Sequence, residues 1–132
     1  MEKQAFENLK PPIALVVDDE PLVLMDTADM ISEEGYGVIE ATSAAEAYEI
    51  LLQFPSVELV LTDVQTGGAI DGLELAREVS RRWPQICVVV ASGAMRPRSG
   101  DLPAGAVFLA KPLSPSLVHQ VIKEHCQPPG EM

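Results

Sequence analysis

The amino-acid sequence predicts a single α/β domain in which βα units repeat along the chain and form a doubly wound, five-stranded parallel sheet. Two observations lead to this prediction. Short apolar runs alternate with amphipathic segments of helical period. The chain has 132 residues, enough for one sizeable hydrophobic core. We place the domain at residues 12–126, between flexible tails at 1–11 and 127–132.

Five strands are predicted, each from a run of five or six residues in which Val, Ile, Leu and Ala are frequent. The first of them, IALVV, is continuously apolar and mostly β-branched or aliphatic, the pattern of a strand buried on both faces. The strands are expected at residues 13–17, 37–41, 58–62, 86–91 and 106–110.

Helices are predicted from apolar stripes and from signals at their ends. Pro21 suits the first turn of a helix, and Ser43 with Glu46 three residues later is a capping-box pattern. Between residues 91 and 106, prolines and glycines predominate, so the helix of the fourth unit is expected to be short or irregular. The other helices are expected from Pro21 to Gly35, from Ser43 to the residue before Pro55, from about Gly72 to about Trp83, and from about Ser114 to a point before Pro128.

The composition argues against several functional classes. There are 20 acidic and 9 basic residues, a formal net charge of −11, whereas a nucleic-acid-binding surface needs Lys and Arg. No apolar run is long enough to span a membrane, and the polar N-terminus lacks the apolar core of a signal peptide. Cys87 and Cys126 lack metal-site spacing, and we expect both to be reduced in a cytoplasmic protein, with Cys87 in the core.

Polar side chains follow four of the predicted strands at the point where each strand ends. Asp18 and Asp19 follow the first strand, Asp63 the third, Ser92 the fourth and Lys111 the fifth. In an open α/β sheet, ligands bind beyond the carboxyl ends of the strands. Each residue alone has an ordinary explanation, such as helix capping or solvent exposure, but together they indicate a functional site.

Phosphoryl transfer is the chemistry that this group of residues supports best. Close carboxylates repel one another unless a cation intervenes, and Mg²⁺, or Mn²⁺ in its place, prefers oxygen ligands of this kind. A carboxylate can also act as a nucleophile and form an aspartyl phosphate. We therefore expect Asp63 to be the acceptor, with the metal on Asp19 near Asp18, Lys111 as the cation and Ser92 as a hydrogen-bond donor.

Five motifs of the sequence resemble the receiver domain of two-component response regulators. They are VVDDEP at 16–21, LTD at 61–63, DGLEL at 71–75, VVVASG at 88–93 and FLAKP at 108–112. The resemblance extends from residue 13 to about residue 125 and implies a flavodoxin-like (βα)5 fold. Because no effector domain follows the last predicted helix, we expect a stand-alone receiver.

The resemblance implies a role for each acidic residue. Asp63 would receive a phosphoryl group from a histidine kinase or a histidine phosphotransfer protein. Asp19, Asp63 and the backbone carbonyl of Gln65 would bind Mg²⁺, and Asp18 would hold the metal through water. The domain would catalyse its own phosphorylation and dephosphorylation without being a conventional enzyme, and would signal by contacts with a downstream protein. A homodimer is a further option.

The same resemblance implies a switch on the other side of the site. Lys111 would contact the phosphate, Ser92 would move toward it, and Phe108 corresponds to the switch aromatic of the family. The Lys111–Pro112 peptide bond is often cis in receivers, and only X–Pro bonds adopt the cis form at low cost.

Two other functions compete with the phosphoacceptor hypothesis. Receivers usually carry a proline four residues after the acceptor, where this chain has Gly67, and the loop to Asp71 is one residue longer. A degenerate receiver that binds a partner without phosphorylation is therefore the main alternative.

A phosphatase of the haloacid dehalogenase type is disfavoured, because its second aspartate is replaced here by Gln65. Acyl-transfer chemistry is also disfavoured, since His119 and His125 fall on the last predicted helix, away from Ser92.

Overall fold

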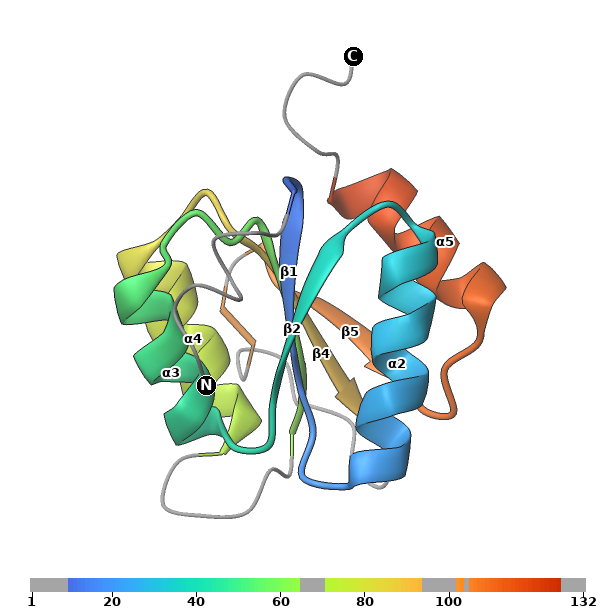
Figure 1. Cartoon of the computed structure of the whole chain (residues 1–132). Coiled ribbons are helices and arrows are strands. Elements are labelled where there is room, and N and C mark those ends of the chain that lie inside the picture. Colours follow the sequence, from blue (N-terminus) through green and yellow to red (C-terminus); the bar gives the residue numbers. More distant parts are fainter. Residues whose placement is uncertain (1–9, 65–70, 94–101, 104, 127–132) are drawn as a thin grey trace.

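The computed structural model describes residues 10–64, 71–93, 102–103 and 105–126, which form one sheet of five strands flanked by helices (Figure 1). The strands are β1 (Ile13–Val17), β2 (Gly37–Ala41), β3 (Leu59–Asp63), β4 (Cys87–Ser92) and β5 (Val107–Ala110). The helices in the described ranges are α2 (Pro21–Glu33), α3 (Ala44–Gln53), α4 (Gly72–Arg82) and α5 (Pro115–His125). The predicted α/β fold is confirmed. The expected short helix after β4 and most of the two expected tails fall outside the described residues.

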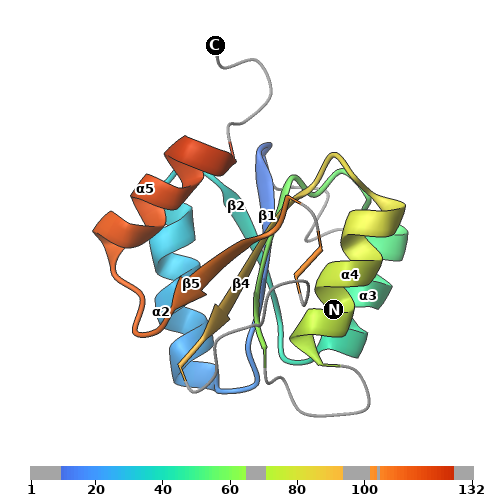
Figure 2. The same ribbon diagram turned by 180° about the vertical axis from the view of Figure 1, so that it is seen from behind.

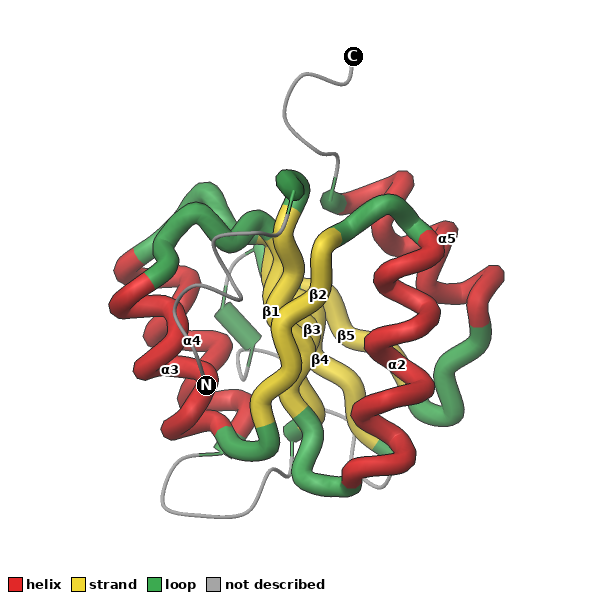
Figure 3. Tube along the Cα trace, viewed as in Figure 1, coloured by secondary structure: helices red, strands yellow, loops and turns green. Residues whose placement is uncertain are grey.

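Every pair of neighbouring strands is parallel, and the strand order is β2-β1-β3-β4-β5. Helices α2 and α5 cover one face of the sheet and helices α3 and α4 cover the other, as the two opposite views show (Figures 1 and 2). The tube representation shows the same three layers, with the strands between two layers of helix (Figure 3). Because all strands run in one direction, their carboxyl ends lie at one edge, where ligands bind in this architecture.

The hydrophobic core has two halves, one on each face of the sheet. Alternate residues of β1 show the division, since Leu15 and Val17 belong to the half beneath α3 and α4, whereas Ala14 and Val16 belong to the half beneath α2 and α5. All five residues of β1 are buried. This two-sided burial explains why the inner strands are continuously apolar in sequence rather than alternating.

The starts of α3, α4 and α5 are fixed by hydrogen bonds to side-chain caps. The hydroxyl of Ser43 accepts a hydrogen bond from the Glu46 backbone N–H at 3.0 Å, as the capping-box pattern predicts. The Glu46 carboxylate, however, accepts from the backbone N–H of Thr42 at 2.7 Å, one residue before the cap. Asp71 and Ser114 cap α4 and α5 in the same way, by accepting from Glu74 and Leu117.

The two cysteines differ from the prediction. Cys87 and Cys126 form a disulfide with their Cα atoms 5.5 Å apart, which joins the first residue of β4 to the residue after α5. The expectation that both are reduced is therefore wrong for this structure. Cys87 is also only half-buried, whereas Cys126 belongs to the core. Their separation of 39 residues gives no local signal of pairing, because only the fold brings them together.

Among the described residues, none of the helices combines the length and the apolar character that crossing a bilayer would require.

Candidate functional site

Three carboxylates meet at the carboxyl edge of the sheet. Asp18 and Asp19 follow β1, and Asp63 is the last residue of the neighbouring strand β3. One oxygen from each carboxylate lies within 4.8 Å of those of the other two. Asp18 is buried, Asp63 is half-buried and Asp19 is exposed, so the group opens toward solvent on one side. The structure thus confirms that these three predicted residues lie together.

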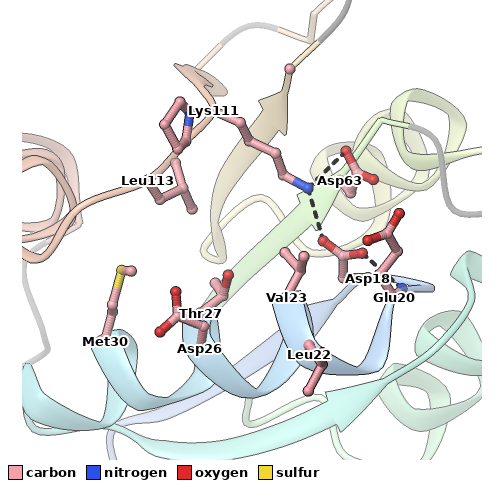
Figure 4. Close-up of a pocket in the computed structure, with 12 residues that line it drawn as sticks. Asp18, Glu20, Leu22, Val23, Asp26, Thr27, Met30, Asp63, Lys111 and Leu113 are labelled. Atoms are coloured by element: carbon pink, nitrogen blue, oxygen red, sulfur yellow. Dashed lines mark hydrogen bonds and ion pairs between the residues drawn. The ribbon is translucent and has the colours of Figure 1, made fainter.

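Asp18 is held in place by contacts in three directions. Its backbone N–H donates to the carbonyl of Ala41 at 3.1 Å, which ties the end of β1 to the end of β2. One carboxylate oxygen accepts from the backbone N–H of Glu20 at 3.0 Å, and the other contacts the Nζ atom of Lys111 at 2.9 Å (Figure 4). A buried carboxylate needs such partners, because an unpaired buried charge is costly.

Lys111 places an ammonium group between two of the carboxylates. Its Nζ atom lies 2.9 Å from Asp18 and 3.5 Å from Asp63 (Figure 4). Burial opposes the charged form of Lys111, but the hydrogen bond that its ammonium donates to Asp18 and the charges of Asp63 and Asp18 outweigh burial and raise the lysine pKa. Lys111 is therefore a cation at neutral pH. The Lys111–Pro112 peptide bond is cis, as the resemblance implies.

The structure also brings Ser92 to this edge. Ser92 is the last residue of β4, is buried, and accepts a hydrogen bond on its carbonyl from the Lys111 backbone N–H at 3.0 Å. Asp63 is paired in register with Ala91, the residue before Ser92. Phe108 is partly buried on β5, opposite Val90. Its expected role as a switch is still a prediction.

Two predicted features cannot be placed. Gln65, whose carbonyl is expected to bind metal, lies outside the described residues, as does the loop that contains Gly67 and Gly68.

The two histidines lie on α5, away from the carboxylates, and His119 is 2.8 Å from Glu34. Their position on the last helix is as predicted.

Gly72 supports the site in a way that the sequence patterns do not predict. Its backbone N–H donates to the carbonyl of Val64 at 2.8 Å, which fixes the start of α4 against the end of β3. A Cβ atom at this position would overlap the backbone carbonyl of Asp63. The glycine in the DGLEL motif is thus the available signal, because only a residue without a side chain allows this close approach.

We expect Gly72→Ala to lower the free energy of unfolding by about 3 kcal/mol, since the added methyl group must push apart the backbones of α4 and β3. Urea denaturation measures this change. Gly93→Ala is the matched control, because its Cβ would lie 3.6 Å from the Lys111 Cβ, an ordinary contact. Equal stability of the two variants would show that the contact between Gly72 and Asp63 is not tight.

A groove of about 770 Å³ extends from the carboxylates along α2. Its walls include Leu22 and Met30 of α2 and Leu113 of the segment after β5 (Figure 4). Leu22 is 81% exposed and Met25, also on α2, is 57% exposed. The sequence pattern does not predict these exposed apolar side chains, because their outward position depends on how α2 packs on the sheet.

The donor set fits a hard divalent cation. All three side chains offer carboxylate oxygens, the ligands that Mg²⁺ prefers, and exposed Asp19 leaves room for the waters that Mg²⁺ retains. Three carboxylates face one ammonium group, so the site has an excess of negative charge that a divalent ion would offset.

Comparisons with known proteins agree with the fold. The family model for the response regulator receiver domain matches residues 14–123. The phyllosphere-induced regulator PhyR of Methylorubrum extorquens is 28% identical over 83% of this chain and 42% of its own length. The sensor kinase CckA of Brucella abortus is 36% identical over 83% of this chain and 12% of its own length. The receiver domain of NtrX from Brucella abortus superposes with a TM-score of 0.76 at 28% identity, over 86% of this chain and 97% of that one.

The doubly wound sheet, with three carboxylates and a lysine at its carboxyl edge, has the arrangement that the receiver-like motifs of the sequence predict. Since the family model covers most of the sequence, the chain belongs to the response regulator receiver domain family. The chain spans less than half the length of PhyR and CckA, so it corresponds to one part of these longer relatives.

Proposed function

We propose that this chain is a phosphoacceptor receiver that takes a phosphoryl group onto Asp63 and signals through protein–protein contacts. The observation that carries the proposal is the position of Asp63, half-buried at the end of β3 with the Lys111 ammonium 3.5 Å from one oxygen. The carboxylate is accessible to a donor on its solvent side. The Lys111 ammonium provides positive charge, which phosphoryl transfer requires to offset the negative charge on the phosphoryl oxygens.

The proposed reaction is a displacement at phosphorus. An oxygen of Asp63 attacks the phosphoryl group of a phosphohistidine, the new O–P bond forms, and the N–P bond to the leaving imidazole breaks. Asp18, Asp19 and Asp63 would hold Mg²⁺, which when bound neutralises negative charge on the phosphoryl oxygens. Lys111 contributes a second positive charge that is already in position, because Asp18 holds its Nζ atom at 2.9 Å. Hydrolysis of the aspartyl phosphate returns the domain to its starting state.

We propose a histidine kinase or a histidine phosphotransfer protein as the phosphoryl donor, acting in the cytoplasm. The similarity to a segment of the sensor kinase CckA supports a donor of this kind. Exposed Leu22 on α2 lines the groove beside the carboxylates, where a donor could dock while presenting its histidine to Asp63. The chain's net charge of −11 supports a protein partner rather than a nucleic acid.

Incubation with a small phosphodonor tests the proposed function without a cognate kinase. Acetyl phosphate with Mg²⁺ is expected to add one phosphoryl group to the intact chain, as measured by mass spectrometry, and omission of Mg²⁺ is expected to prevent the addition. Absence of an adduct at saturating donor would contradict the proposal and would favour a receiver that binds its partner independently of phosphorylation.

Mg²⁺ is expected to raise the melting temperature, because an ion that binds only the native carboxylate group stabilises the folded state. The rise should be roughly 5 °C when the Mg²⁺ concentration exceeds its Kd about tenfold. Differential scanning calorimetry with and without EDTA measures the shift. Asp19→Asn should reduce the shift, whereas Asp29→Asn, a change at an exposed position of α2, should preserve it. No shift at millimolar Mg²⁺ would contradict the metal site.

A further inference from the structure

The Cys87–Cys126 disulfide lies at the edge of the sheet opposite the carboxylates. Cys87 is the first residue of β4, whereas Asp63 is the last residue of the neighbouring strand β3. Cys126 follows the last residue of α5. The disulfide therefore joins the C-terminal end of α5 to the beginning of β4, an inner strand of the sheet. It is not part of the proposed phosphoacceptor site.

The disulfide borders a cavity of about 510 Å³, whose lining includes Cys87, Cys126 and His125. Cys87 is only partly buried, and its sulfur lies 3.5 Å from the backbone carbonyl of His125. Cys126 is 4% exposed. A small thiol can thus approach the disulfide from this cavity on the side of Cys87, without unfolding of the core around Cys126.

The disulfide adds a covalent connection at the end of α5, where the helix is also held by apolar packing and a hydrogen bond. The helix packs its buried residues Val118, Val121 and Ile122 on the same half of the core as α2. At its end, the Tyr36 hydroxyl donates to the carbonyl of Cys126 at 3.2 Å. If the disulfide opens, the last turn of α5 keeps this hydrogen bond and its apolar packing but loses its covalent connection to the sheet.

We propose that Cys87 and Cys126 form a reversible redox site that exchanges with low-molecular-weight thiols and thereby sets how firmly α5 is held. A thiolate attacks one sulfur of the disulfide and forms a mixed disulfide with it, and the other cysteine leaves as a thiolate. A second thiol then releases the first cysteine. The two cysteines are reduced to thiols while the two small thiols are oxidised to one disulfide, and a small disulfide oxidant drives the reverse exchange.

The alternative is that this pair is a permanent structural disulfide. The two hypotheses differ in whether a small thiol can reach the sulfur atoms in the native state. Disulfides in reducing compartments are mostly transient and redox-sensing. A cavity beside a partly exposed sulfur suits exchange in the native state. The proposal is independent of phosphorylation, so the Asp63→Asn variant should retain the redox response in full.

The experiment uses the whole chain in glutathione buffers that range from reducing to oxidising, at a temperature well below unfolding. Thiols trapped with an alkylating agent are counted by intact mass. We expect the disulfide fraction to follow the buffer reversibly, the melting temperature to fall by roughly 10 °C on reduction, and amide hydrogen exchange at the end of α5 to become faster. The loop closed by the disulfide spans 39 residues, which supports a shift of this size.

The Cys87→Ala, Cys126→Ala double variant is the control. Its melting temperature should not respond to the buffer and should resemble that of the reduced protein. Two free thiols in the oxidising buffer would overturn the proposal, and so would a disulfide that small thiols reduce only after denaturation. An unchanged rate of hydrogen exchange in α5 on reduction would overturn the claim that the disulfide holds this helix.

Discussion

Asp63→Asn is expected to abolish the phosphoryl adduct completely, both from a small phosphodonor and from a phosphorylated histidine protein. The amide lacks the anionic oxygen that attacks phosphorus, and it removes one of the three carboxylates that would hold Mg²⁺. The fold should survive, because the change removes negative charge from a group of like charges. Intact mass spectrometry measures the adduct, and a melting curve without Mg²⁺ measures the fold.

Asp26→Asn is the matched control for this variant. Asp26 lines the same groove from α2 but does not belong to the three carboxylates that lie together. This variant should accept the phosphoryl group as the unmodified chain does. If the Asp63→Asn variant acquired an equal amount of phosphate, Asp63 would not be the acceptor, whatever the behaviour of the control.

Lys111→Met is expected to slow phosphorylation by roughly a hundredfold to a thousandfold, since it removes a positive charge already in position near the acceptor oxygen. The rate of adduct formation at fixed phosphodonor and Mg²⁺ measures this effect. The methionine side chain fills similar space, so lost charge rather than lost packing dominates the result. A rate within a factor of two of the unmodified chain would contradict the assigned role of Lys111.

The same variant should lose about 3 kcal/mol of stability in metal-free buffer, because Asp18 is left as a buried carboxylate without its ammonium partner. Mg²⁺ should restore part of the loss by replacing the missing positive charge. Urea denaturation with and without Mg²⁺ measures both effects. Lys123→Met, a change at an exposed position of α5, should alter stability by less than about 0.5 kcal/mol.

The fold was predictable because its signals are local. Continuous apolar runs mark strands that are buried on both faces, and Pro21, Ser43 and Gly72 lie where helices begin. The strand bounds differ from the predicted ones by one residue at most. The order β2-β1-β3-β4-β5 has no local signal in the sequence, because it depends on which strands pair across the sheet.

The site was predictable to the extent that it depends on strand ends. Asp18, Asp19, Asp63 and Lys111 each follow or end a strand, and parallel strands bring such positions to one edge. The short ion pair between Lys111 and Asp18 was not predictable, because it depends on the path of one long side chain between two strands.

Contacts between different elements were not predictable from the sequence either, because they depend on how the folded elements pack. The disulfide joins the first residue of β4 to the residue after α5, which are 39 residues apart in the sequence. The close approach of Gly72 to the Asp63 carbonyl depends on the angle at which α4 meets β3. The capping box at α3 is a smaller case. Ser43 caps the helix as the pattern predicts, but the Glu46 carboxylate accepts from the backbone N–H of Thr42 rather than from that of Ser43.

The most direct test of the phosphoacceptor role is to identify the modified residue chemically. Borohydride reduces an aspartyl phosphate to homoserine, so treatment of the phosphorylated chain followed by peptide mass spectrometry reports the acceptor. We predict homoserine at residue 63, formed only when Mg²⁺ and phosphodonor are both present. Homoserine at another aspartate, or none after complete phosphodonor treatment, would contradict the account.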